Sequence, residues 1–158
     1  MLGKTIEEIR IGESADFTKT VTGYDVYSFA GITGDFNPAH INTVYAAETA
    51  FGKTIAHGIL SIGFISNILG TQLPGPGSIT LSLDCSFMKP VFIGDTITAN
   101  VKVTKLDGGK NRVWLRTWCT NQKGDLVIEG EAKMMPVTRE MKEAALQQQE
   151  KLNNSLGV

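Results

Sequence analysis

The sequence predicts an α+β protein in which an antiparallel sheet curves around one long central helix. Residues Gly58 to Leu69 are apolar at nearly every position, and a helix that is apolar on most faces must be surrounded by protein. After this helix the pattern changes to an alternation of period two, which is typical of strands that bury one face. Short turns separate these strands, so consecutive strands are expected to pair antiparallel.

The residues before the central helix are predicted to form one strand and two short helices. Ser14 to Thr22 alternates and is rich in β-branched residues, which predicts a first strand. Thr22 then caps a short helix expected from Tyr24 to Ile32, and a second short helix opens at Asn42-Thr43 and ends at Thr49. Gly70 and the following Pro74-Gly75-Pro76-Gly77 terminate the central helix.

The second half reads as four strands, at Ser78–Met88, Thr96–Leu106, Val113–Asn121 and Leu126–Pro136. One buried helix with a strand before it and a run of strands after it is the hot-dog arrangement. We therefore expect a single hot-dog domain over residues 1–137, with residues 1–13 as a loosely structured lead-in. Residues 138–158 form a polar tail, rich in Glu, Gln and Lys, that is expected to be helical or frayed and outside the core.

The composition is that of an ordinary soluble protein of 158 residues, with 42% hydrophobic and 20% charged residues and a net charge of −1. This near-neutral balance gives no electrostatic reason to expect nucleic acid or a membrane surface as a partner, and no segment reaches the roughly 20 apolar residues of a membrane span. The acidic N-terminus argues against a signal peptide, so a cytoplasmic protein is expected. Cys85 and Cys119 lack metal-ligand spacing and are expected to be buried free thiols.

The chemistry is expected at the turn Gly34-Asp35-Phe36-Asn37-Pro38-Ala39-His40. Pro38 lies between a carboxylate, Asp35, and an imidazole, His40, so the two side chains cannot sit on one regular helix. A kinked turn can bring both to one cavity, where an acid and a base share one water molecule. The chain has 2 histidines, and the other, His57, stands at the start of the central helix.

This turn and the string Ala56-His57-Gly58-Ile59-Leu60 resemble the signature of the MaoC-like hydratases. The resemblance continues through residues 73–78 and 86–95 and covers most of residues 14–136. It is strongest toward the short, single-hot-dog (R)-specific enoyl-CoA hydratases. It implies reversible syn addition of water to a trans-2-enoyl-CoA, giving an (R)-3-hydroxyacyl-CoA, with no cofactor beyond the coenzyme A thioester that is the substrate.

Carried over residue by residue, the resemblance makes Asp35 and His40 the catalytic pair. The pair would orient one water and move its protons, and a coupled pair shares these protons, so neither step is assigned to one residue. The N–H of Gly58, in the first turn of the central helix, is expected to bind the thioester oxygen as that atom gains negative charge. Ser66 matches a family serine that hydrogen-bonds within the site, and Asn37 matches an asparagine that holds the turn.

Several of these residues have a plainer interpretation. Residues 35–38 are also compatible with a polar turn of no catalytic role, and His57 either supports the turn or takes part directly. The Ser66 hydroxyl is equally placed to bond back to the carbonyl one turn earlier. Three basic residues are expected to be solvated strand charges, unless one or two of them meet the coenzyme A phosphates: Lys89, Arg112 and Arg116.

The functional hypothesis is a homodimeric or higher homo-oligomeric hydratase, because hot-dog relatives pair two sheets edge to edge. The alternatives within enzymes are a hot-dog acyl-CoA thioesterase and a 3-hydroxyacyl-acyl-carrier-protein dehydratase; the second would call for a basic docking face, and the sequence has no clear basic cluster. An alternative of another class is a non-catalytic subunit that binds acyl-CoA. The presence of both Asp35 and His40 weakens that alternative.

Overall fold

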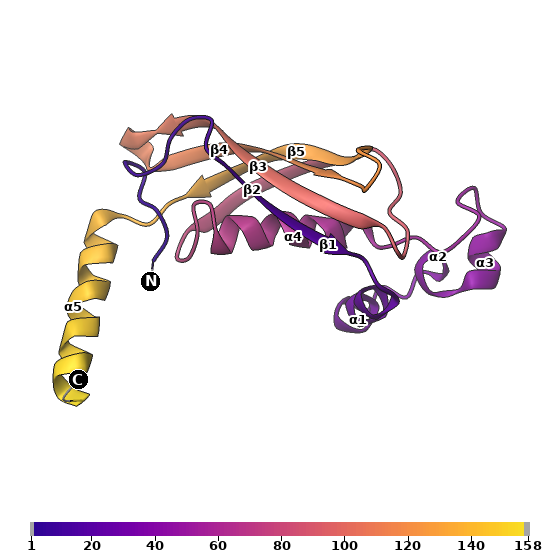
Figure 1. Cartoon of the computed structure of the whole chain (residues 1–158), viewed down its shortest axis with the longest axis horizontal. Coiled ribbons are helices and arrows are strands. Elements are labelled where there is room, and N and C mark those ends of the chain that lie inside the picture. The colour runs from indigo at the N-terminus through magenta and orange to yellow at the C-terminus, as the bar shows by residue number, and fades with distance from the viewer. Residues whose placement is uncertain (1, 157–158) are drawn as a thin grey trace.

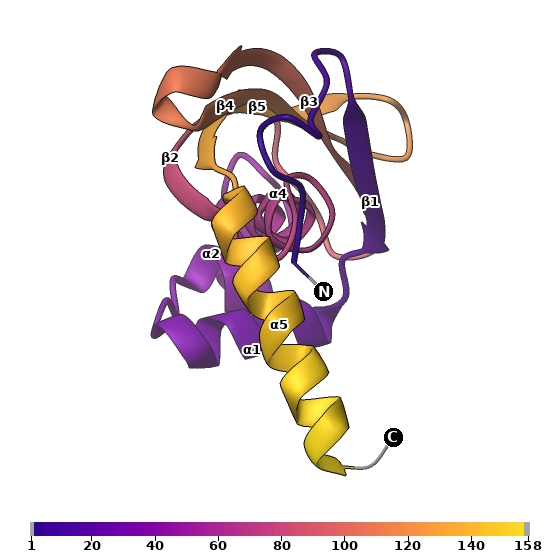
Figure 2. The ribbon, with the colours of Figure 1, turned by 90° about the vertical axis from the view of Figure 1, so that its left-hand side faces the viewer.

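The computed structural model describes residues 2–156, apart from the side chains of 150, 152 and 154–156, and it confirms the α+β hot-dog architecture. A 5-stranded antiparallel sheet in the order β1-β3-β4-β5-β2 curves over one long helix, α4 (Gly58–Thr71), as Figures 1 and 2 show. All the predicted strands are present: β1 (Ser14–Thr20), β2 (Ile79–Phe87), β3 (Thr96–Asp107), β4 (Arg112–Thr120) and β5 (Leu126–Met135).

The expected pairing of consecutive strands holds for β3 with β4 and for β4 with β5, and it is wrong for β2 with β3. β2 lies at the far edge of the sheet, beside β5. The segment that joins β2 to β3 is not a hairpin, because it passes the start of α4 and bonds there. The N–H of Ala56 donates to the carbonyl of Val91 over 2.7 Å, and Ile55 forms a bridge with Phe92.

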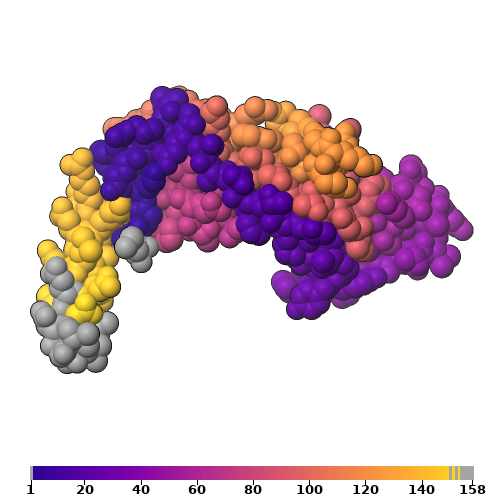
Figure 3. Space-filling model, in the orientation of Figure 1, coloured from indigo at the N-terminus to yellow at the C-terminus, as the bar shows by residue number. Residues whose placement is uncertain are grey.

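α4 buries one face against the sheet through Phe64, Ile65, Ile68 and Leu69. The opposite face is open, so the prediction that protein surrounds this helix is wrong for the single chain. Ile59 is 55% exposed; Gly63, Ser66 and Gly70 continue the open stripe. The reason is geometric, because one curved sheet covers one side of a helix. Figure 3 shows the resulting arch, which is hollowed between α1 at one end and the C-terminal helix at the other.

Three short helices form a lobe at one end of the sheet (Figure 1): α1 (Gly23–Thr33), α2 (Pro38–Ile41) and α3 (Thr43–Ala47). Thr22 caps α1 as predicted, and Asp25 completes a capping box by accepting from the Thr22 N–H over 2.8 Å. The single turn of α2 was not predicted. It begins at Pro38, whose fixed φ suits the first helical position.

The C-terminal segment forms α5 (Arg139–Leu156), which leaves the sheet at the end opposite to the α1–α3 lobe. The described part of the tail is thus helical, one of the two forms expected for it, and residues 157–158 lie outside the described part. No helix among the described residues is long and apolar enough to cross a membrane. Cys119 is a buried free thiol as expected, whereas Cys85 is partly exposed because it lies on the edge strand β2.

Candidate active site

The site begins where α1 ends. Gly34 adopts a left-handed conformation, with φ of 77°, and its N–H donates to the carbonyl of Ala30 over 2.8 Å. A glycine takes this conformation without the steric cost that a Cβ would bring. The chain therefore leaves α1 sharply and enters the loop at Asp35.

Side-chain oxygens shape the loop that follows. Asp35 Oδ1 accepts from the N–H of Asn37 over 3.2 Å, and Asn37 Oδ1 accepts from the N–H of Ala39 over 3.0 Å. Asn37 thus serves as the N-cap of α2, a role that asparagine performs well because its side chain replaces a missing backbone acceptor. This network bends the chain at Pro38 and carries His40 back toward Asp35.

His40 is held in one tautomer. Its Nδ1 lies 2.8 Å from the carbonyl oxygen of Ile55, and a carbonyl only accepts, so Nδ1 carries the proton and Nε2 carries the lone pair. The N–H of Ile55 donates in return to the carbonyl of Ala39 over 3.1 Å. His40 therefore presents a free basic nitrogen from a ring whose other side is fixed.

His57 packs directly beneath this loop. It is 2% exposed, and its Nε2 donates to the backbone carbonyl of Asp35 over 3.0 Å. Its ring stacks on His40, with centroids 3.9 Å apart, and on Phe29, with centroids 4.8 Å apart. Within residues 2–156 its Nδ1 has no hydrogen-bond partner. Of the two roles left open for His57, this geometry is that of a residue that supports the turn.

The loop brings three titratable side chains together. Asp35, His40 and His57 each place a possible ligand atom within 4.8 Å of the other two. The Asp35 side chain is 52% exposed, and its Oδ2 lies 3.9 Å from His57 Nε2. These are also the residues that could hold a metal ion. The hydrogen bonds at His40 Nδ1 and His57 Nε2 leave the carboxylate, His40 Nε2 and His57 Nδ1 as the unengaged ligand atoms among the described residues.

A cavity of about 410 Å³ opens beside the start of α4, and His40 is part of its wall. The rest of the wall is largely apolar, which suits the acyl part of a ligand. The other lining residues are Phe51, Ile55, Ala56, Gly58, Ile59, Ser61, Phe87, Met88, Lys89, Pro90, Val91 and Ile128.

Gly58 is the first residue of α4, where a backbone N–H has no partner within the helix. A Cβ on this residue would lie 2.5 Å from Cε1 of Phe87, closer than van der Waals contact permits. The absence of a side chain therefore lets the ring of Phe87 approach the helix start, and both residues line the cavity.

The two serines of α4 differ in their surroundings. Ser66, the serine singled out from the sequence, is exposed and is not part of the cavity wall. Ser61, which sequence reasoning missed, lines the cavity, is fully buried, and has a hydroxyl without a hydrogen-bond partner among the described residues. Its spacing of three residues from Gly58 was the available signal, since such residues share a helix face.

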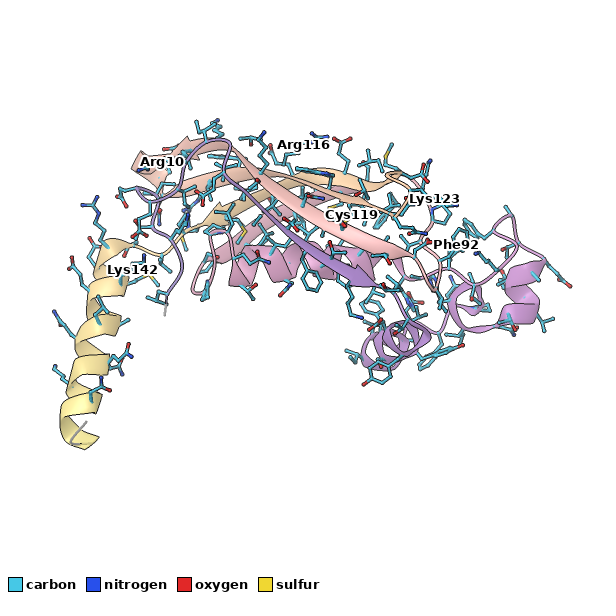
Figure 4. All side chains as sticks on the ribbon, in the orientation of Figure 1. Arg10, Phe92, Arg116, Cys119, Lys123 and Lys142 are labelled. Atoms are coloured by element: carbon cyan, nitrogen blue, oxygen red, sulfur yellow. The ribbon has the colours of Figure 1, made fainter. Side chains whose placement is uncertain are left out.

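The basic residues near the sheet are paired. Lys89 Nζ lies 2.6 Å from Asp125 Oδ1, and Lys89 alone of the three candidates lines the cavity. Arg116 projects from the outer face of the sheet (Figure 4) and pairs with Glu129 over 2.6 Å. Arg112 donates to the carbonyls of its neighbours Lys110 and Asn111.

Cys119 lies on the other side of the sheet from Arg116, with its Sγ 3.8 Å from the carbonyl of Ser61. Burial raises the pKa of this thiol to about 12, and the neighbouring Cys85 adds to the rise. The thiolate is the nucleophilic form of cysteine. Cys119 is therefore a neutral core residue near the cavity and no candidate nucleophile.

Comparison with known proteins identifies relatives of this chain. Residues 7–122 match the family described as "MaoC like domain". The (R)-specific enoyl-CoA hydratase of Rhodospirillum rubrum is 52% identical over 133 residues, which cover 84% of this chain and 92% of that protein. The solved (R)-hydratase of Aeromonas caviae, described as involved in PHA biosynthesis, has a TM-score of 0.81 at 40% identity, covering 83% of this chain and 99% of that one. R-hydratase PhaJ1 from Pseudomonas aeruginosa has a TM-score of 0.80 at 39% identity, covering 85% and 86%.

Proposed function

This chain belongs to the MaoC-like dehydratase family, and we propose that it is an (R)-specific enoyl-CoA hydratase. As a hydro-lyase it adds water reversibly to a trans-2-enoyl-CoA and gives an (R)-3-hydroxyacyl-CoA. One observation supports the assignment of the site: His40 lines an apolar cavity, and a ligand atom of its imidazole lies within 4.8 Å of one of the exposed Asp35 carboxylate.

The reaction needs a base that takes a proton from the attacking water and an acid that gives a proton to C2 of the substrate. In our proposal Asp35 and His40 hold one water between them; as its oxygen forms the bond to C3, the pair takes up one proton from that water. The pair then delivers a proton to C2 on the same face, which gives syn addition, and the reverse steps dehydrate the product. Because both transfers stay within the pair, no cofactor is required, and such catalysis contributes about 10²–10⁴-fold in rate.

Two parts of the site would serve the thioester. Attack at C3 moves negative charge to the thioester oxygen, and the N–H of Gly58 at the positive end of α4 is placed to receive it. Lys89 is the basic residue proposed to meet the coenzyme A phosphates, because it lines the cavity and Arg112 and Arg116 do not.

The remaining predicted residues would hold the catalytic residues in place without reacting themselves. Asn37 holds the loop by capping α2, and His57 fixes the carbonyl of Asp35 while its ring supports His40. Ser66 lies on the open face of α4. We propose that it contributes to the site once a second subunit covers that face.

We also propose that the protein acts in the cytoplasm. The two edges of the sheet differ in a way that supports a homodimer as the minimal unit. The β2 edge exposes Ile79, Leu81 and Phe87 beside a single carboxylate, Asp84, whereas the β1 edge carries Asp16 and Lys19. Charged residues on an edge strand oppose pairing, and an apolar edge invites it. We propose that two copies pair through β2, so Leu81→Lys should shift the assembly toward monomer in sedimentation experiments while Lys19→Leu should not. An unchanged assembly state in Leu81→Lys would place the interface elsewhere.

The direct test is the hydration of crotonyl-CoA. Asp35→Asn and His40→Ala should each lower kcat by at least about 10²-fold, because each removes one half of the proton-transfer pair. Asp16→Asn, which removes an exposed carboxylate on β1, serves as the matched control and should stay within about twofold of the wild type. A near wild-type rate in either site variant, with the fold intact by circular dichroism, would refute the assignment.

The product separates the alternative enzymes. A hydratase consumes the enoyl absorbance without releasing a thiol and yields the (R) alcohol, whereas a thioesterase releases coenzyme A. Comparison of coenzyme A and acyl-carrier-protein thioesters separates the hydratase from a carrier-protein dehydratase. Saturable binding of acyl-CoA without turnover would indicate the remaining alternative, a non-catalytic subunit that binds acyl-CoA.

A further inference from the structure

We propose that the hydroxyl of Ser61 is a second hydrogen-bond donor for the thioester oxygen, acting beside the N–H of Gly58. This inference rests on the proposed hydratase function and adds a residue to it. The feature that points to Ser61 is an unpartnered, fully buried hydroxyl in the wall of the cavity that also contains His40.

The position of Ser61 on α4 directs its side chain toward the helix start. Residues three apart lie on the same helix face, and helical side chains lean toward the N-terminus, over the preceding turn. Ser61 therefore reaches back over the turn that begins at Gly58, and both residues line the same cavity. A backbone N–H and a hydroxyl thus lie within one helical turn of each other in residues that line this cavity.

The hydroxyl is free to bind a ligand. A serine within a helix usually donates to the carbonyl one turn earlier, and Ser61 has no such bond among residues 2–156. The nearby thiol of Cys119 approaches the Ser61 carbonyl and not its hydroxyl. A buried hydroxyl without a partner is unfavourable, so an acceptor delivered by a ligand would remove this cost at the moment of binding.

The thioester oxygen is the acceptor that fits. The acyl chain offers no polar atom to this largely apolar wall, and the reacting C3 must face His40 and Asp35. When C3 is attacked, electrons move to this oxygen and form an enolate, which two fixed donors stabilise better than one. Fixed donors are most effective where water is excluded, and Ser61 is fully buried.

The test is the kinetics of Ser61→Ala with crotonyl-CoA. Loss of one oxyanion donor lowers kcat by about 10²–10³-fold in known cases, and for this hydroxyl we expect a loss of about 10- to 100-fold with KM within about threefold. The matched control is Thr117→Val, because Thr117 is also fully buried with an unpartnered hydroxyl but lies on β4 and does not line the cavity. Thr117→Val should keep the wild-type kcat.

Two further measurements separate a catalytic from a structural role. Ser61→Cys, a weak donor of similar size, should recover part of the rate lost in Ser61→Ala. Acetoacetyl-CoA, whose enolate carries the same oxyanion, should show a smaller enolate absorbance when bound to Ser61→Ala than to the wild type. Thermal stability should not fall in Ser61→Ala, since the variant loses a polar group that makes no bond.

The outcomes distinguish this inference from the function on which it rests. Wild-type protein that does not hydrate enoyl-CoA would overturn the function itself. Active wild-type protein with a kcat for Ser61→Ala within about twofold, or an equal loss in Thr117→Val, would overturn the role of Ser61 alone. If Ser61→Ala fails to fold, an unchanged enolate signal and rate in Ser61→Cys would likewise overturn it.

Discussion

Two lobes project from opposite ends of the same sheet, and they are attached in different ways (Figure 1). The α1–α3 lobe is tied to the core by partly buried hydrogen bonds: the buried His57 bonds to Asp35, and Ile55 bonds to both Ala39 and His40. α5 is tied by exposed ion pairs, Lys142 with Glu8 over 2.5 Å and Arg139 with Glu7 over 3.6 Å.

The two kinds of attachment differ in how precisely they fix the position of each lobe. Exposed ion pairs contribute little, because water screens them and the long side chains lose freedom when they pair. Hydrogen bonds of a buried imidazole are specific in direction and costly to leave unmade. Hydrogen bonds of this kind hold the α1–α3 lobe, which carries the proposed chemistry, whereas exposed ion pairs hold α5. Changes at the root of the α1–α3 lobe should therefore affect activity, and changes in α5 should not.

The largest effect is expected at the junction of the lobe with α4. Gly58→Ala places a methyl group where the ring of Phe87 now lies, 2.5 Å from Cε1, and should push that ring into the cavity. We expect kcat/KM for crotonyl-CoA to fall by about 10- to 100-fold, because the displaced ring would occupy space that the ligand needs beside the Gly58 amide.

The double variant Gly58→Ala/Phe87→Ala tests the cause of this loss. If the clash is responsible, removal of the ring should restore a measurable part of the activity, and the two changes should not be additive. Full additivity would mean that the methyl group acts by blocking the amide itself.

A smaller effect is expected at the start of α1, which is farther from the chemistry. Lys19, 2.7 Å from Oδ2, and the Thr22 hydroxyl hold the pKa of Asp25 at about 2. A folded-state pKa below the unfolded value of about 3.9 contributes stability that is present above about pH 4 and is lost as the pH falls through about 2.

Asp25→Asn should accordingly lower the free energy of unfolding by about 1 kcal/mol at pH 7, the usual value for a helix-cap interaction. Urea denaturation of both proteins between pH 7 and pH 2 measures the difference, which should shrink below about pH 4. Asp16→Asn provides the comparison, since Asp16 is an exposed carboxylate outside any cap. A difference that grows on acidification would contradict a lowered pKa for Asp25 in the folded protein.

The smallest effect is expected in the tail. A chain that ends at Thr138 lacks α5 together with the Lys142–Glu8 and Arg139–Glu7 pairs, and it should keep the wild-type kcat and KM within about twofold. Lys142→Ala in the full-length chain should change the free energy of unfolding by less than about 1 kcal/mol. A large loss of hydration activity in the shortened chain would show that α5 takes part in the assembly that completes the site.

Much of the fold could be predicted because its patterns are local. The apolar run from Gly58 and the alternation after Ser78 define α4 and the strands, and Thr22 defines the start of α1. Strand order was harder, since the pairing of β2 with β5 depends on where the connection at Val91 attaches. That attachment joins residues far apart in the sequence, so the local periodicity of apolar residues does not predict it.

The sequence by itself determined the fold class, the family and the two residues, Asp35 and His40, on which the proposed chemistry rests, because a short motif and regular periods are written in adjacent positions. Tertiary structure alone decided how the residues around this pair are buried and oriented. It buried Ser61 in the cavity wall, left Ser66 exposed, and set His57 beneath Asp35. Burial and orientation arise from how the sheet, α4 and the lobe pack together, and packing is a property of the whole chain.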